Sequence, residues 1–76
     1  MQFTIDEYFV IASIIDEKLA KEERLADRCV NMANKLIDIG NINLADNFIG
    51  TASAHIGNME NLSLLKRRVF NRTNWH

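Results

Sequence analysis

Residues 4–39 read TIDEYFVIASIIDEKLAKEERLADRCVNMANKLIDI, and this run predicts a single helix of about 35 residues. A capping box marks its start: the Thr4 side chain can accept a hydrogen bond from the backbone N–H of Glu7, and the Glu7 side chain can accept one from the N–H of Thr4. Gly40 marks its end, because glycine readily adopts the left-handed conformation that closes a helix. The remaining chain is therefore expected to turn at Gly40 and pack back along this helix.

An apolar stripe runs along this helix. It indicates the surface that the chain after Gly40, which we call the return arm, covers. Its members alternate by four and three residues, with Glu22 as the one polar member: Tyr8, Ala12, Ile15, Leu19, Glu22, Ala26, Cys29, Ala33 and Leu36. A helix of this length spans roughly 52 Å, whereas a compact globule of the same chain has a radius of gyration of roughly 11 Å. Because residues 21–23 contain no helix breaker, we favour an elongated hairpin over a compact chain with a break at that point.

The return arm predicts two shorter helices. Asn43 can cap the first, and Gly57 with Asn58 predicts its end. The expected apolar positions are Ala45, Phe48, Ile49, Ala52 and Ile56 in the first helix, and Leu62, Leu65 and Val69 in the second. We therefore predict an all-α antiparallel helical hairpin, in which one long N-terminal helix (about 4–39) is packed by two shorter helices (about 43–57 and 60–71).

The stretch from Cys29 to Ala52 resembles one helical hairpin of the tetratricopeptide type. Cys29, Met32, Ala33 and Leu36 match the packing positions of its first helix, Gly40 matches its turn, and Ala45, Ile49 and Ala52 match its second helix. The resemblance occurs once and covers about a third of the chain, whereas such repeats need about three copies to be stable. What it implies here is the geometry of a hairpin, and no function.

The amino-acid composition restricts the class of protein to which the chain can belong. The chain has 76 residues, no proline, three glycines and one cysteine, which indicates one all-α domain without a disulfide framework. We take residues 1–76 as that domain and residues 72–76 as a frayed C-terminal tail. The N-terminus lacks the basic region of a signal peptide, and the longest apolar run is far below the ~20 residues of a spanning helix. We therefore predict a cytoplasmic location and do not favour a membrane as partner.

The N-terminal segment of the long helix is apolar around most of its circumference. Phe9, Val10, Ile11 and Ile14 extend beyond the single face that one return helix can cover. We expect these four residues to pack against another copy of the chain or against a partner protein. Burial inside a compact, broken chain is the alternative.

A basic cluster closes the sequence. Residues 62–76 carry four basic side chains and no acidic one, whereas the whole chain has a net charge of −1. Lys66, Arg67, Arg68 and Arg72, with Trp75 as an aromatic that can stack on a base, form a candidate contact for an anion or nucleic acid. Cations in the last turns of a helix also interact favourably with its dipole, and we favour that structural role over nucleic-acid binding.

No residue pattern indicates an enzyme, a metal site or a cofactor. The acidic pairs are sequence neighbours that point about 100° apart on a helix, and His55 has no ligand partner at metal-binding spacing.

We expect a small non-catalytic interaction module that forms a homo-oligomer and binds or inhibits an unidentified protein. The alternatives are an oligomeric binder of nucleotide or nucleic acid and a peripheral membrane- or lysis-associated regulator. Nine asparagines are typical of an AT-rich genome, such as that of a phage or mobile element.

Overall fold

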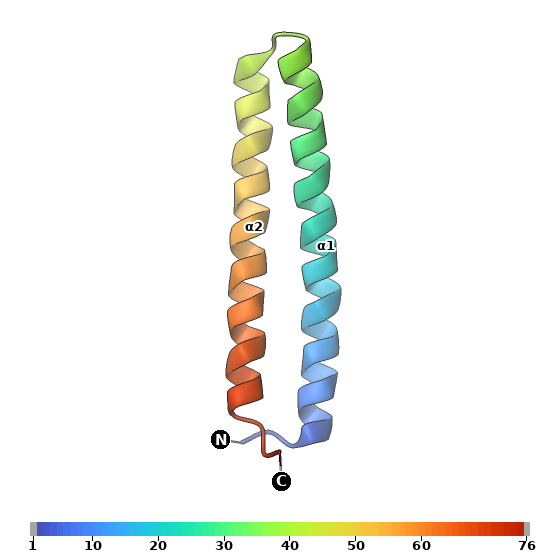
Figure 1. The fold of residues 1–76 in the computed structure, drawn as a ribbon, viewed down its shortest axis with the longest axis vertical. Coiled ribbons are helices and arrows are strands. Elements are labelled where there is room, and N and C mark those ends of the chain that lie inside the picture. Colours follow the sequence, from blue (N-terminus) through green and yellow to red (C-terminus); the bar gives the residue numbers. More distant parts are fainter. Residues whose placement is uncertain (1, 76) are drawn as a thin grey trace.

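The computed structural model describes residues 2–75, which form two antiparallel helices, α1 (Ile5–Asp38) and α2 (Ile42–Asn71). The helices lie side by side along their whole length, with the turn at one end and both chain termini at the other (Figure 1). The molecule measures 58 × 15 × 12 Å, and its radius of gyration is 17.1 Å. The predicted elongated hairpin is therefore confirmed, and α1 runs through residues 21–23 without a break.

The predicted caps at both ends of α1 are present. Thr4 Oγ1 accepts a hydrogen bond from the Glu7 N–H at 3.1 Å, and Glu7 Oε1 accepts one from the Thr4 N–H at 3.0 Å. Gly40 has a φ of +82°, and the N–H of Asn41 donates to the Leu36 carbonyl at 2.8 Å. This bond satisfies a carbonyl that the end of the helix would otherwise leave unpaired.

The prediction of two separate return helices is wrong, because α2 is continuous through Gly57 and Asn58. Its cap is Asn41, whose Oδ1 accepts a hydrogen bond from the Leu44 N–H, and not Asn43. A glycine within a helix costs only about 1 kcal/mol relative to alanine. The packing against α1 continues on both sides of Gly57, and this tertiary contact outweighs the local preference for an end.

The helices meet along a row of side chains that we call the seam. On α1 the seam is the predicted nine-member stripe from Tyr8 to Leu36, and each member is buried or half-buried. On α2 it follows the same alternating spacing: Ala45, Phe48, Ala52, His55, Met59, Leu62, Lys66, Val69 and Thr73. The prediction that Ile49, Ile56 and Leu65 belong to the core is wrong, since their side chains are 44–47% exposed.

The buried part of the seam is built mainly from small side chains. Five of its buried members are alanines, namely Ala12, Ala26, Ala33, Ala45 and Ala52. Around the turn, Ala33, Leu36 and Ala45 form a buried cluster on which the half-buried Phe48 packs. Alanine buries little apolar surface, so the seam contributes less hydrophobic stabilisation than a core of leucine and isoleucine would.

Two short segments close the open end of the hairpin, and we call this contact the clasp. The Phe3 N–H donates to the Arg72 carbonyl at 2.7 Å, and the Asn74 N–H donates to the Phe3 carbonyl at 2.9 Å. Thr73, which is 8% exposed, donates from Oγ1 to the Val69 carbonyl at 2.6 Å. Residues 72–75, for which we expected fraying, make these contacts, while His76 lies outside the described residues.

Candidate interaction surfaces

The four apolar residues predicted as an interface lie on different sides of α1. Phe9, Val10 and Ile14 are 50–61% exposed, and Ile11 is half-buried. Successive residues of a helix point about 100° apart, so Phe9 and Ile11 flank the seam on opposite sides while Val10 faces outward. These side chains are available for contact, but they do not form one face.

An aromatic cluster lies beside the clasp. The ring of Trp75 lies 5.0 Å from that of Tyr8 and 4.9 Å from that of Phe70, measured between centroids. Phe9 adds an edge contact to Trp75 at 6.4 Å. The Trp75 indole N–H donates to the Phe70 carbonyl at 3.1 Å. Trp75 thus ties residues after α2 to both helices, and this packing occupies the ring that the sequence suggested for base stacking.

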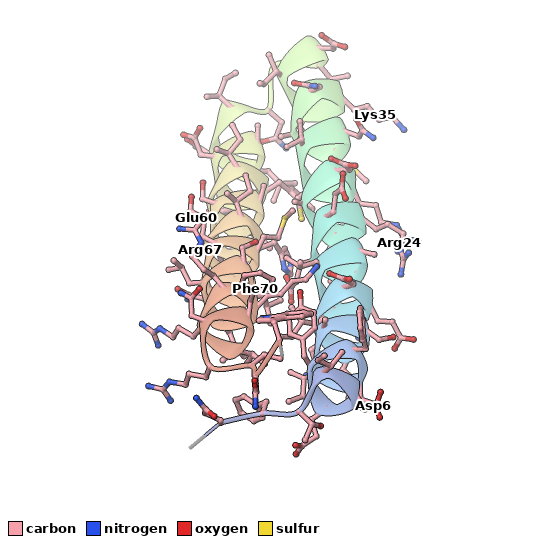
Figure 2. The ribbon with its side chains drawn as sticks, turned by 60° about the horizontal axis from the view of Figure 1, so that its bottom comes forward. Asp6, Arg24, Lys35, Glu60, Arg67 and Phe70 are labelled. Carbon is pink, nitrogen blue, oxygen red and sulfur yellow. The ribbon has the colours of Figure 1, made fainter. Side chains whose placement is uncertain are left out.

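The predicted basic cluster is divided. Lys66 lies in the seam, where its Nζ donates to Asp16 Oδ1 at 2.8 Å, and this hydrogen bond raises the pKa of Lys66. Arg67, Arg68 and Arg72 are exposed. Figure 2 shows Arg67 projecting from the outer side of α2, away from α1. The structure therefore brings Lys66 and Trp75 into intramolecular contacts and leaves three arginines at the surface.

The polar break in the seam is a hydrogen-bonded pair of side chains from the two helices. His55 Nδ1 lies 2.5 Å from Glu22 Oε2, and both side chains are about one-fifth exposed. The hydrogen bond from His55, with a smaller one from Asn58, lowers the pKa of Glu22. The sequence alone does not indicate this pair, because it forms only when the register between the two helices is known.

The lowered pKa of Glu22 predicts a loss of stability in acid. A carboxylate whose pKa is lowered in the native state stabilises the fold above its unfolded pKa of about 4.3, and that contribution is lost as the pH falls through the folded value. Glu22→Gln should therefore lower the urea midpoint at pH 6, and the difference from the parent should shrink towards pH 3. Glu17→Gln, at an exposed carboxylate, is the control and should not reduce the acid sensitivity. An equal effect of Glu22→Gln at both pH values would contradict this assignment.

Each broad side of the hairpin carries two rows of residues that flank the seam. One side, the isoleucine flank, holds two rows that recur every seven residues beside the seam: Phe9, Asp16, Glu23, Val30 and Ile37 on α1, and Ile42, Ile49, Ile56, Ser63 and Phe70 on α2. The contacts of both Phe9 and Phe70 with the Trp75 ring place these two rows on the same side. The other side, the opposite flank, includes a shallow hollow lined by Lys18, Lys21, Asn58 and Asn61.

The isoleucine flank was missed in the sequence analysis, although the sequence contains its signal. Ile42, Ile49 and Ile56 recur every seven residues, directly beside the seam. This second row was not distinguished from the core, because Ile49 and Ile56 also fit the apolar face of a single helix, and only the position of α1 shows that they lie beside the seam.

Among the described residues, no group of three or more His, Cys, Asp or Glu side chains could hold a metal ion. Neither α1 nor α2 contains a stretch apolar and long enough to cross a membrane. Comparison of the chain with protein-family models, with curated proteins and with solved structures gives no match.

Proposed function

We propose that this chain is a non-catalytic interaction module, a helical hairpin that self-associates and presents the assembled surface to a partner protein. The observation that carries this proposal is the mismatch between a thin core and an extensive apolar surface. Three of the buried hydrophobic residues are larger than alanine, namely Ile15, Leu36 and Val69. Domains near this size usually need a disulfide, a metal or association to reach ordinary stability. With one cysteine in the chain, association is the route that the surface supports.

The apolar surface extends over both helices. Fifteen large apolar side chains in the described part of the chain are at least 41% exposed, from Phe9 near the start of α1 to Trp75 after α2. Single exposed apolar residues are normal on a protein surface, but rows of them along an elongated molecule mark an interaction site. Assembly would remove these rows from water and supply the hydrophobic stabilisation that the seam lacks.

The outer sides of the helices are charged and would select the partner. Arg24 and Lys35 project from the outer side of α1, and Glu60 and Arg67 project from that of α2 (Figure 2). Charges at the rim of an interface mainly set specificity and association rate. Binding of nucleic acid through Arg67, Arg68 and Arg72 is the alternative, and it has less support because Lys66 and Trp75 are engaged within the hairpin.

The proposal predicts the mass of the protein in solution. Light scattering on a sizing column, over a concentration series, should give a stable multiple of 8.7 kDa, because burial of the exposed rows stabilises the assembly. A mass of 8.7 kDa at every concentration up to about 1 mM, the range of very weak association, would rule out self-association. Partner binding would then need a separate demonstration.

A further inference from the structure

We infer that the isoleucine flank is the surface on which a second copy of this chain docks, with the two turns at the same end of a four-helix bundle. This inference rests on the proposed self-association and specifies its geometry. Its starting point is the width of the apolar stripe. Helices that pack only in pairs need apolar residues at the seam, whereas helices of a larger bundle carry a further apolar row beside it. On α2 that further row is Ile42, Ile49 and Ile56.

The half of the isoleucine flank nearest the turn is continuous and aliphatic. Val30 and Ile37 on α1 and Ile42, Ile49 and Ile56 on α2 are each 43–51% exposed. From Ile42 to Ile56 this patch runs roughly 21 Å along the helix. Over the same length the opposite flank also carries apolar residues, namely Leu25, Met32, Ile39 and Leu44, but on α2 it is interrupted by Thr51 and Asn58. The isoleucine flank is therefore the side whose row on α2 stays apolar from Ile42 to Ile56, and docking would remove this uninterrupted row from water.

The area of one flank matches what a stable dimer needs. A face of 58 by 15 Å covers on the order of 900 Å², close to the ~800 Å² per partner of standard interfaces. The accessible surface of the chain is 5754 Å², whereas a compact monomer of this mass is expected to have about 4,700 Å². The excess of roughly 1,000 Å² is again about the area that one partner contributes to such an interface.

Charge complementarity selects the relative orientation. The middle of the isoleucine flank is polar, with Asp16 and Glu23 on α1, and Lys66 reaches Asp16 there from the seam of α2. With both turns at the same end, α1 of one copy faces α2 of the other. Asp16 then lies level with Lys66 of the second copy, and Val30 lies level with Ile49. With the copies head to tail, α1 would instead face α1, so Asp16 and Glu23 near the middle of one flank would lie against the same acidic residues of the other copy, and these like charges would repel each other.

A matched pair of variants tests the surface. Ile49→Asp places a charge in the aliphatic patch, and Leu64→Asp places the same charge at an equally exposed position, 48% against 44%, on the outer side of α2. Ile49→Asp should raise the dimer dissociation constant by roughly 100-fold or more, because the charge enters the interface twice, and Leu64→Asp should leave it within about threefold. Circular dichroism checks that both variants stay helical, and Ile49→Ala, which should weaken the dimer about tenfold, replaces Ile49→Asp if that variant does not fold.

A distance measurement tests the orientation without changing the flank. A spin label at Asp38→Cys, in a Cys29→Ser background, lies at the turn end of α1. Copies with their turns together should give a label separation below about 30 Å, whereas head-to-tail copies should give roughly 50 Å, the length of α1. A long distance, or an assembled Ile49→Asp variant, would overturn this inference and leave self-association intact. A parent protein that is monomeric throughout would overturn both.

Discussion

Ile15→Ala should lower the free energy of unfolding by about 2–4 kcal/mol, because it deletes one of the few large side chains that are buried in the seam. Ile15 is 3% exposed, so its removal loses burial and leaves a cavity between the helices. Whole small domains are stable by only about 5–15 kcal/mol, and the expected loss is therefore a large part of the total. Urea denaturation followed by circular dichroism measures it, at one fixed protein concentration because association adds to apparent stability.

The neighbouring residue provides the control for Ile15→Ala. Ile14 has the same side chain but is 50% exposed, and Ile14→Ala should change the free energy of unfolding by less than about 1 kcal/mol. The two substitutions remove the same atoms from neighbouring residues, so the difference between their effects reports the burial of the side chain. Equal losses from the two substitutions would show that the face of α1 assigned to the seam is wrong.

Ala33→Asp should be at least as damaging, with a loss of about 3 kcal/mol or more. Ala33 is 2% exposed and packs in the cluster with Leu36 and Ala45 beside the turn. A carboxylate there has neither room nor an ionic partner within the cluster. In thermal unfolding, a loss of this size corresponds to a midpoint lowered by more than about 12 °C for a domain of 60–100 residues.

The control for Ala33→Asp is Asn34→Asp, which introduces the same charge on the next residue at an exposed position. Both carboxylates lie near the C-terminal end of α1, where the helix dipole disfavours negative charge by about 0.3–1 kcal/mol. The difference between the two midpoints therefore isolates the cost of burial. If Ala33→Asp melted within about 3 °C of Asn34→Asp, a shift worth less than 1 kcal/mol, the cluster at the turn would not be a core.

The local signals in the sequence were sufficient to predict the bounds of α1 and the position of the turn. The capping box at Thr4 and the glycine at position 40 involve residues that are close in sequence, and the structure contains both. The seam of α1 was also predictable, because an alternating spacing of four and three residues is a property of one helix. These features needed no knowledge of the partner helix.

The sequence-based predictions were wrong or incomplete where contacts between the two helices determine the structure. Gly57 has a local preference against helix, but the seam continues past it at Met59 and Leu62 and keeps α2 intact. Glu22 and His55 are separated by 33 residues, so their hydrogen bond depends on the register of the hairpin. The assignment of Ile49 and Ile56 to the core was wrong for the same reason, since both fit the apolar face of α2 and only the position of α1 shows that they flank the seam.

The clasp has a consequence for the order of folding. Contacts near Gly40 join residues a few positions apart, whereas the clasp joins Phe3 to residues 72 and 74. The entropy cost of closing a loop rises with its length, so pairing should begin at the turn and proceed towards the termini, with each new contact enclosing only a few additional residues. The clasp should then form last and open first. A circular permutant, with the original termini joined and the chain opened at Gly40, should reverse this order while keeping the same seam.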